Sequence, residues 1–503
     1  MKFTVAFLIA LFAFSLIFPL LYAGIPPDRD EGTFLLIARE VKDGSVLYRD
    51  YADNKPPGIF FLLIPVVALA GVDTLKIRLA AGLVNYLTAV FIFFIGRKIA
   101  SEKAGAIGAV SYLILINGFG LAGFLLKTEP ISNLFVCAGI YALLQAEKKE
   151  LHYVLAGALF AVGAMVRQNV AYTLPLAAYR IWETDRHCLK KYVLLGAGVV
   201  LGLLPFFAYL VYNGVLTDMS YYTTYGISDP HNLNATGPLD PWSIIKNPLS
   251  SIVYFGFFMF LLLSAYGINS RDLKADYKKF LWTWFFLATL VGAIAPFIQS
   301  LLFMMAAPPL ALLTAVGTLG VWREFKELNE GKIKTFWRYL AFAIVMLFLI
   351  TSMVTYPDKI NEIRQRGSVF STVMSASDIG YVKGQLGNHD SSGIRFYVVM
   401  TEPQLYYMLE TKPITKFPFM SSYGYRFGDE KTFDKEVLQK LENAKPDYIV
   451  YNDKQEFWNI TGISEVLKSP NFEKLLAFIG DNYAEKGRKD EIILYERKDL
   501  LAN

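Results

Sequence analysis

Residues 25–60 read IPPDRDEGTFLLIAREVKDGSVLYRDYADNKPPGIF and directly follow an apolar run. Apolar residues on one helical face predict an amphipathic helix in a membrane interface, and they are Phe34, Leu35, Ala38 and Val41. Asp30 and Glu31 lie at the start of this helix, where acidic side chains suit the helix dipole. Gly44 favours a helix end after it. The apolar run 59–69 is short for a span and predicts a second interfacial or re-entrant helix.

The composition outside this stretch is that of a membrane protein. Of 503 residues, 54% are hydrophobic and 18% are charged, whereas soluble domains carry about 25% charged residues. The small net charge of +5 gives no reason to expect a nucleic-acid partner, and two cysteines cannot form a disulfide framework. A spanning helix needs about 20 apolar residues. About eleven runs meet this description: 4–24, 77–96, 104–123, 129–146, 152–166, 169–182, 191–212, 250–269, 280–297, 300–321 and 337–355.

The distribution of Lys and Arg predicts the orientation in the membrane. Basic residues concentrate in alternate loops, which the positive-inside rule assigns to the cytoplasm. The N-terminus is then cytoplasmic. The first outer loop 25–76, the segment 213–249 and the tail after Tyr356 are then extracytoplasmic. We therefore expect a multi-pass protein of the cell membrane.

The tail, 356–503, is more charged and alternates strand-like with helix-like stretches. We expect short buried strands at 394–400, 448–451 and 492–495, and helices at 404–409, 435–441 and 473–479. The expected fold is mainly α. A transmembrane catalytic domain, 1–355, would be followed by a small extracytoplasmic α/β domain, 356–503.

The first outer loop carries an ordered set of motifs. An acidic pair at the helix start is followed by Ala-Arg-Glu at 38–40, Tyr-Arg-Asp at 48–50 and Lys-Pro-Pro at 55–57 before an apolar run. This set resembles the first-loop signature of the GT-C superfamily of membrane glycosyltransferases. The nearest branch is that of protein O-mannosyltransferases and lipid A aminoarabinose transferases. Other segments resemble the late helix and outer domain of that branch, namely 307–313, 380–383, 401–407 and 446–453.

The resemblance implies an enzyme that takes a sugar from a polyprenyl-phosphate donor, such as dolichyl phosphate mannose. It would transfer the sugar with inversion to a protein, lipid or glycan acceptor at the outer membrane face. Displacement at an anomeric carbon needs a carboxylate to accept the acceptor proton, and Asp30 matches the family's acid. Glu31 would position groups or bind a metal. Lys55 matches a lysine on the departing phosphate, where charge builds up, and Arg39 is expected beside it.

Other candidate residues have equally simple structural explanations. Glu129, in Lys-Thr-Glu-Pro, resembles an acidic substrate-site position, but it also suits the start of a helix. Arg167 is a candidate for a second phosphate contact or a snorkelling anchor. Tyr225 and His231 are candidates for sugar binding, and an interfacial aromatic belt explains the aromatic residues of this segment as well.

The sequence departs from the family where a metal would be held. Asn54 stands where some relatives have an acid before Lys-Pro-Pro, and Gln299 and Ser300 stand where some carry a histidine. The four histidines show no ligand spacing. A divalent metal ion held by Asp30, Glu31 or Glu129 stays open.

Three alternative functions fit parts of the sequence. Many spans also suit a polytopic transporter of lipid-linked sugars or other solutes, although we find no inverted repeat. A receptor or scaffold without catalysis would not need Asp30, Glu31 and Lys55 together. An oligosaccharyltransferase of the same superfamily would show a Trp-Trp-Asp stretch, and the sequence contains no Trp-Trp pair.

Overall fold

The structure is a computed structural model. It describes residues 2–118, 121–146, 149–185, 188–228, 257–267, 271–294, 304–326, 361–367, 374–386, 395–399, 402–418, 434–453 and 470–501. The chain forms two compact units, each discontinuous in sequence. The first unit comprises Met1–Tyr22, Arg78–Tyr209 and Thr236–Asn361. The second comprises Ala23–Ile77, Leu210–Ala235 and Glu362–Asn503, and thus unites the first outer loop with the tail. The division into domains at residue 355 would separate these two segments, and it stays a prediction.

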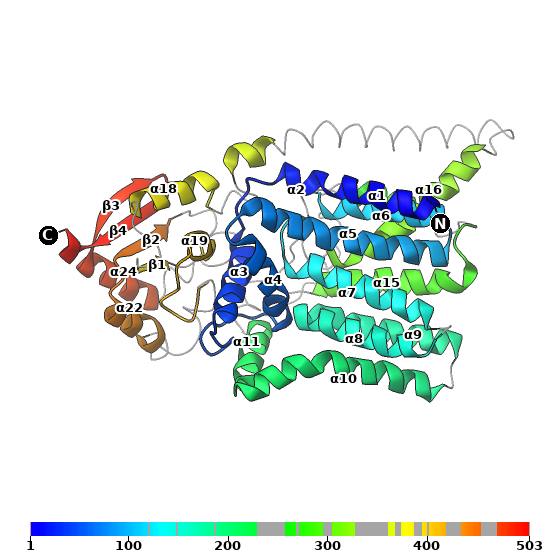
Figure 1. Ribbon diagram of the computed structural model, residues 1–503, viewed down its shortest axis with the longest axis horizontal. Helices are drawn as coiled ribbons and strands as arrows, with labels where there is room; N and C mark the ends of the chain where they lie inside the picture. Colours follow the sequence, from blue (N-terminus) through cyan, green and yellow to red (C-terminus); the bar gives the residue numbers. More distant parts are fainter. Residues whose placement is uncertain are drawn as a thin grey trace. The chain divides into compact units, whose positions relative to one another are not determined.

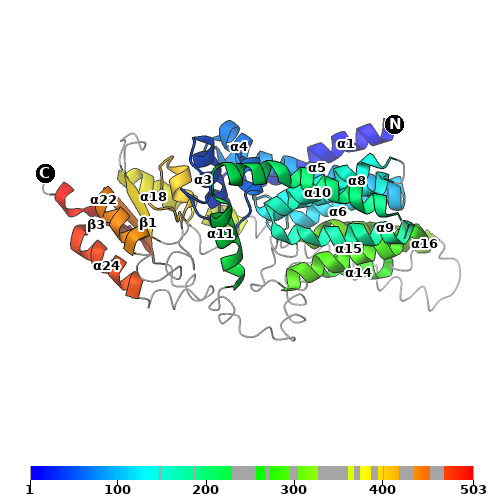
Figure 2. The same ribbon diagram turned by 90° about the horizontal axis from the view of Figure 1, so that it is seen from below.

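The first unit is helical in its described residues, and its long helices run alongside one another (Figures 1 and 2). Its elements are α1 (Lys2–Ser15), α2 (Ile17–Leu21), α5 (Thr74–Ile99), α6 (Glu102–Ile116), α7 (Thr128–Gln145), α8 (Leu151–Val166), η1 (Gln168–Tyr172), α9 (Thr173–Thr184), α10 (Leu189–Tyr212), α14 (Phe257–Gly267), α15 (Ala275–Ile294) and α16 (Ala307–Lys326). Each run expected to span the membrane overlaps one of these elements, except 337–355, which lies outside the described residues.

Helix length limits how many spans are established. Within the described ranges, four helices are long and apolar enough to cross a membrane: Phe3–Leu21, Thr74–Ile99, Leu189–Tyr212 and Met304–Arg323. Gly58–Ala70 and Leu151–Val166 are apolar but shorter. The membrane character of the chain is therefore confirmed, while the expected number of about eleven spans is not.

Small residues let helices of the first unit approach closely. A Cβ atom on Gly157 of α8 would lie 2.1 Å from the carbonyl oxygen of Leu195 in α10. One on Gly198 of α10 would lie 2.0 Å from that of Val154 in α8. Only glycine fits at these crossing points, a packing mode common between membrane helices.

The second unit combines helices with a small mixed sheet (Figure 1). Its helices are α3 (Arg29–Lys42), α4 (Gly58–Ala70), α11 (Leu216–Ser228), α18 (Ala376–Leu386), α19 (Gln404–Met408), η4 (Asp434–Leu438), α22 (Gln439–Ala444), α24 (Pro470–Asn482) and η6 (Lys498–Leu500). Its strands are β1 (Phe396–Val399), β2 (Tyr448–Asn452), β3 (Tyr483–Lys489) and β4 (Ile492–Arg497).

The strand order is β1-β2-β4-β3, with β1 parallel to β2 and the other pairs antiparallel. Val398 lies opposite Val450, which in turn lies opposite Leu494, so apolar side chains meet across the sheet. The three expected strands are confirmed. β3 was not expected because its sequence, YAEKGRK, is polar. It lies at the sheet edge, where charged residues are tolerated.

Helix α3 forms where the first outer loop predicted a helix. Asp28 caps it, accepting a hydrogen bond from the Glu31 backbone N–H at 2.9 Å. Gly44 follows the helix with a φ of +102°, which explains a glycine there. Most side chains of α3 are buried, the charged Arg29, Glu31 and Glu40 among them. α3 packs against both α4 and α19, so protein covers surface that an interfacial helix would present to water and lipid headgroups.

Candidate active site

The candidate site begins at the first turn of α3. Asp30 is partly exposed in this turn, whereas the neighbouring Glu31 is fully buried. Asp28 caps the helix, so capping does not require Asp30. A partly exposed carboxylate beside a helix N-terminus can exchange a proton with a bound molecule.

A second carboxylate, Asp53, lies near Asp30. Its Oδ1 accepts a hydrogen bond from the Lys55 backbone N–H at 2.8 Å. Burial raises the pKa of Asp53 to about 6, and the negative charge of Asp30 adds to the increase, while Lys55 acts against it. The two carboxylates therefore lie close enough for their charges to interact. Asp53 was not among the site residues predicted from the sequence. Its place two residues before Lys55 was the available signal.

Lys55 supplies the positive charge beside this pair. Its Nζ donates one hydrogen bond within the described part of the chain, to Asn54 Oδ1 at 2.6 Å. An ammonium has three N–H donors, so this contact leaves capacity for a ligand. The Tyr48 hydroxyl donates to the Lys55 carbonyl oxygen at 2.7 Å and fixes the backbone of the turn.

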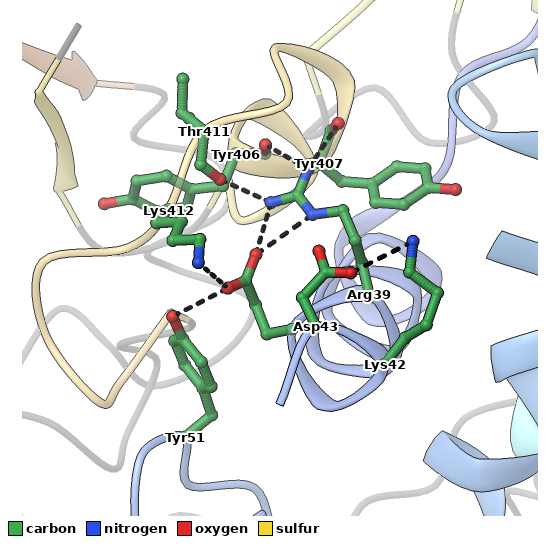
Figure 3. A network of polar contacts seen from close by, with 9 residues as sticks. Arg39, Lys42, Asp43, Tyr51, Tyr406, Tyr407, Thr411 and Lys412 are labelled. Atoms are coloured by element: carbon green, nitrogen blue, oxygen red, sulfur yellow. Dashed lines mark hydrogen bonds and ion pairs between the residues drawn. The ribbon is translucent and has the colours of Figure 1, made fainter. Parts of the chain in front are cut away.

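Arg39, by contrast, is committed to protein acceptors (Figure 3). Its Nε and Nη2 donate to Glu40 Oε1 at 3.1 and 2.9 Å. Its Nη1 and Nη2 also donate to three backbone carbonyl oxygens, those of Tyr406, Tyr407 and Thr411. These contacts use all five N–H donors of a guanidinium. Because a phosphate would have to displace them, we assign Arg39 to the scaffold and not to the donor phosphate.

Glu40, which pairs with Arg39, is also in contact with Tyr51 and Lys412, both labelled in Figure 3. Glu40 is 1% exposed, and its Oε2 lies 3.4 Å from the Tyr51 hydroxyl and 3.6 Å from Lys412 Nζ. This cluster joins the end of α3 to residues of the first loop and the tail.

Glu129 and Arg167 form a separate pair within the first unit. Arg167 lies between α8 and η1 in an extended conformation that interrupts the helix. Its Nη1 lies 2.8 Å from Glu129 Oε1 and donates to Thr128 Oγ1 at 2.8 Å. Arg167 Nε is buried without an acceptor among the described residues. The pairing links two candidate residues, and their roles at the phosphate and the substrate stay predictions.

The remaining candidates are only partly described. Tyr225 lies in α11, and His231 lies outside the described residues, as do Gln299 and Ser300. In the portions of the chain that the structure describes, no group of three or more His, Cys, Asp or Glu side chains could hold a metal ion. Asp30 and Asp53 together supply two carboxylates, whereas such a group needs at least three side chains.

The chain was compared with known proteins. Residues 54–212 match the family described as dolichyl-phosphate-mannose-protein mannosyltransferase. This range includes Lys55, Glu129 and Arg167 but not Asp30. No curated protein matches the sequence.

Solved structures match over almost the whole chain. ArnT from Cupriavidus metallidurans bound to undecaprenyl phosphate is 15% identical, with a TM-score of 0.62 and 97% of each chain covered. The archaeal oligosaccharyltransferase AglB from Archaeoglobus fulgidus, in complex with an inhibitory peptide and a dolichol-phosphate, is 12% identical. Its TM-score is 0.57, with 92% of this chain and 71% of that chain covered. The chain thus has the fold of the GT-C superfamily of membrane glycosyltransferases, and the resemblance predicted from its sequence is confirmed.

Proposed function

We propose that the protein is a glycosyltransferase that uses a polyprenyl-phosphate-linked sugar as donor. It transfers the sugar by inverting displacement to a protein, lipid or glycan acceptor on the outer face of the membrane. The observation that carries the proposal is the grouping of Asp30, Asp53 and Lys55 in the first outer loop of a chain with the GT-C fold.

Asp30 is the general base in this proposal. Its carboxylate accepts the proton of the acceptor hydroxyl as the acceptor oxygen bonds to the anomeric carbon. The bond from that carbon to the phosphate oxygen breaks at the same time, and the polyprenyl phosphate leaves. Asp53 places a second carboxylate near this base.

Lys55 binds the departing phosphate. Negative charge builds up on the phosphate oxygen as the bond breaks, and an ammonium fixed in advance stabilises it. The N–H donors of Lys55 not used by Asn54 suit this role. The support from similar proteins lies in their ligands: the ArnT structure contains undecaprenyl phosphate, and the AglB structure contains a dolichol-phosphate.

A panel of lipid-linked sugars tests the function. Purified protein is incubated with dolichyl-phosphate mannose and with undecaprenyl-phosphate sugars, together with candidate acceptors. Mass spectrometry then measures release of free polyprenyl phosphate and glycosylation of the acceptor. We expect consumption of at least one donor by the wild type and none above background by Asp30→Asn. Movement of an intact lipid-linked sugar across proteoliposomes, with no donor consumed, would identify a transporter instead.

A further inference from the structure

The tail of the chain contains a buried carboxylate at the junction with the first outer loop. Glu402 is 1% exposed, and its Oε1 lies 2.8 Å from Arg29 Nη2 at the start of α3. The same oxygen accepts a hydrogen bond from Asn452 Nδ2 at 2.9 Å. Oε2 accepts hydrogen bonds from the Met374 backbone N–H and from the Gln404 side chain. One carboxylate therefore joins α3 to three parts of the tail.

Arg29 is equally enclosed. It is 7% exposed and directly precedes Asp30 in the first turn of α3. Without Glu402, the enclosed guanidinium of Arg29 would lose a carboxylate partner, and breaking a buried ion pair is strongly destabilising. The ion pair therefore determines where the first turn of α3 can lie.

Contacts farther along α3 support the same arrangement. A Cβ atom on Gly32 would lie 2.5 Å from Gln404 Cβ, so α3 approaches α19 too closely for any side chain there. Arg39 donates to carbonyl oxygens at the end of α19 and just after it. Helix α3 is thus held against residues 402–411 in its first turn, at Arg29 and Gly32, and close to its end, at Arg39.

We propose that Glu402 is a positioning residue for the transfer reaction. By holding Arg29, it fixes the first turn of α3 and so places the Asp30 carboxylate relative to Asp53 and Lys55. The inference rests on the proposed function for the role of Asp30, and it extends that function to the tail. Residues 402–411 then belong to the catalytic scaffold, in addition to any part that the tail has in choosing an acceptor.

The variant Glu402→Gln tests this role. Glutamine keeps the shape but removes the negative charge that pairs with Arg29. Its amide nitrogen also cannot accept the hydrogen bonds that one of the two carboxylate oxygens accepts. The double variant Arg29→Gln/Glu402→Gln removes both charges, and it serves if the single variant does not fold. The matched control is Asp378→Asn. Asp378 is another buried tail carboxylate, 8% exposed, which bonds to Lys489 and Ser375 within the tail.

Hydrogen exchange of the full-length protein measures the positioning directly. We expect Glu402→Gln to speed amide exchange at 29–42 at least tenfold, while 483–497 is unchanged. Asp378→Asn should leave exchange at 29–42 as in the wild type. Unchanged exchange of α3 in both Glu402 variants would overturn the proposal.

Kinetics separate positioning from a general loss of structure. With the donor that the wild type consumes, kcat of Glu402→Gln should fall about 10–100-fold while KM for the donor stays within threefold. The double variant should recover part of the loss, because no buried charge is left unpaired. A normal kcat in a variant whose α3 exchanges faster would also overturn the proposal. If the wild type consumes no donor, the proposed function fails. Hydrogen exchange then still decides whether Glu402 holds α3.

Discussion

Two basic residues of the first outer loop, Arg39 and Lys55, differ in what their side chains contact. Arg39, near the end of α3, has all five N–H donors bonded to a carboxylate and backbone carbonyls. Lys55, in the turn before α4, has one hydrogen bond from its ammonium within the described residues. Both were expected from the sequence to contact the donor phosphate. The difference indicates that the arginine holds the fold, while the lysine is available to a ligand.

The same contrast separates the acids. Glu31, Glu40 and Glu402 are buried, whereas Asp30 is partly exposed. Asp30, the carboxylate that we assign to proton transfer, therefore stands on a helix whose other acidic side chains, Glu31 and Glu40, are buried. The predictions below test this separation of roles, beginning with the largest expected effect.

The largest effect is expected from Asp30→Asn. Asparagine has nearly the same size but cannot accept a proton at neutral pH, and loss of a general base lowers a rate by roughly 10²–10⁴-fold. Donor consumption, measured by mass spectrometry, should fall accordingly while the thermal midpoint stays within a few degrees. The matched control is Asp28→Asn, since asparagine caps a helix about as well as aspartate. Equal turnover by Asp30→Asn and Asp28→Asn would remove the base from the mechanism.

Arg39→Ala should mainly reduce stability. The change leaves the buried Glu40 carboxylate without its closest partner. It also removes one hydrogen bond from each of three carbonyl oxygens, of which those of Tyr406 and Tyr407 keep a backbone N–H donor. Breaking a buried pair typically costs about 3–5 kcal/mol. We expect a lower unfolding midpoint in denaturant or on heating, with donor affinity unchanged in the protein that remains folded. Lys42→Ala on the same helix is the control, because among the described residues Lys42 forms a single, exposed ion pair, with Asp43. A midpoint as high as that of the control would contradict the scaffold role.

The effect of Asp53→Asn should depend on pH. The folded-state pKa of Asp53 is raised from 3.8 to about 6, so its ionised form is disfavoured by folding. Its contribution to stability is favourable below pH 3.8 and is lost as the pH rises through 6. Asparagine does not ionise, so the variant avoids the destabilisation that ionised Asp53 causes in the folded protein. The variant should therefore be more stable than wild type at pH 8, by at most about 3 kcal/mol.

The difference should shrink as the pH falls from about 6 to about 4. Thermal unfolding of both proteins across this range measures it. A stability difference that is the same at every pH would contradict the raised pKa.

The sequence predicted the local structure of the first outer loop and the tail better than it predicted the roles of their residues. Apolar spacing and Gly44 indicated α3, and three strands followed from their β-branched and aromatic residues. The close approach of Gly32 to Gln404 joins segments that are far apart in the chain, so no local pattern reveals it. For the same reason, the periodicity of α3 indicated an exposed face that tail residues in fact cover. β3 was missed because an edge strand does not need apolar residues.

The functions of individual residues were harder to predict from residue type than the secondary structure was. Arg39 and Lys55 are both basic residues in a motif-rich loop, and only their contacts distinguish them. Asp53 is not part of any of the motifs that marked this loop in the sequence. What marks it is its burial and the nearby charge of Asp30, which raise its pKa to about 6 against the opposing effect of Lys55.

The central claim is that Lys55 binds the donor phosphate while Arg39 holds the scaffold. The most direct test measures binding of undecaprenyl phosphate by native mass spectrometry to wild type, Lys55→Ala, Lys55→Arg and Arg39→Lys. We predict that Lys55→Ala weakens binding at least tenfold, that Lys55→Arg retains most of it, and that Arg39→Lys binds like wild type despite a lower unfolding midpoint. Wild-type binding by Lys55→Ala together with loss of binding by Arg39→Lys would contradict the account.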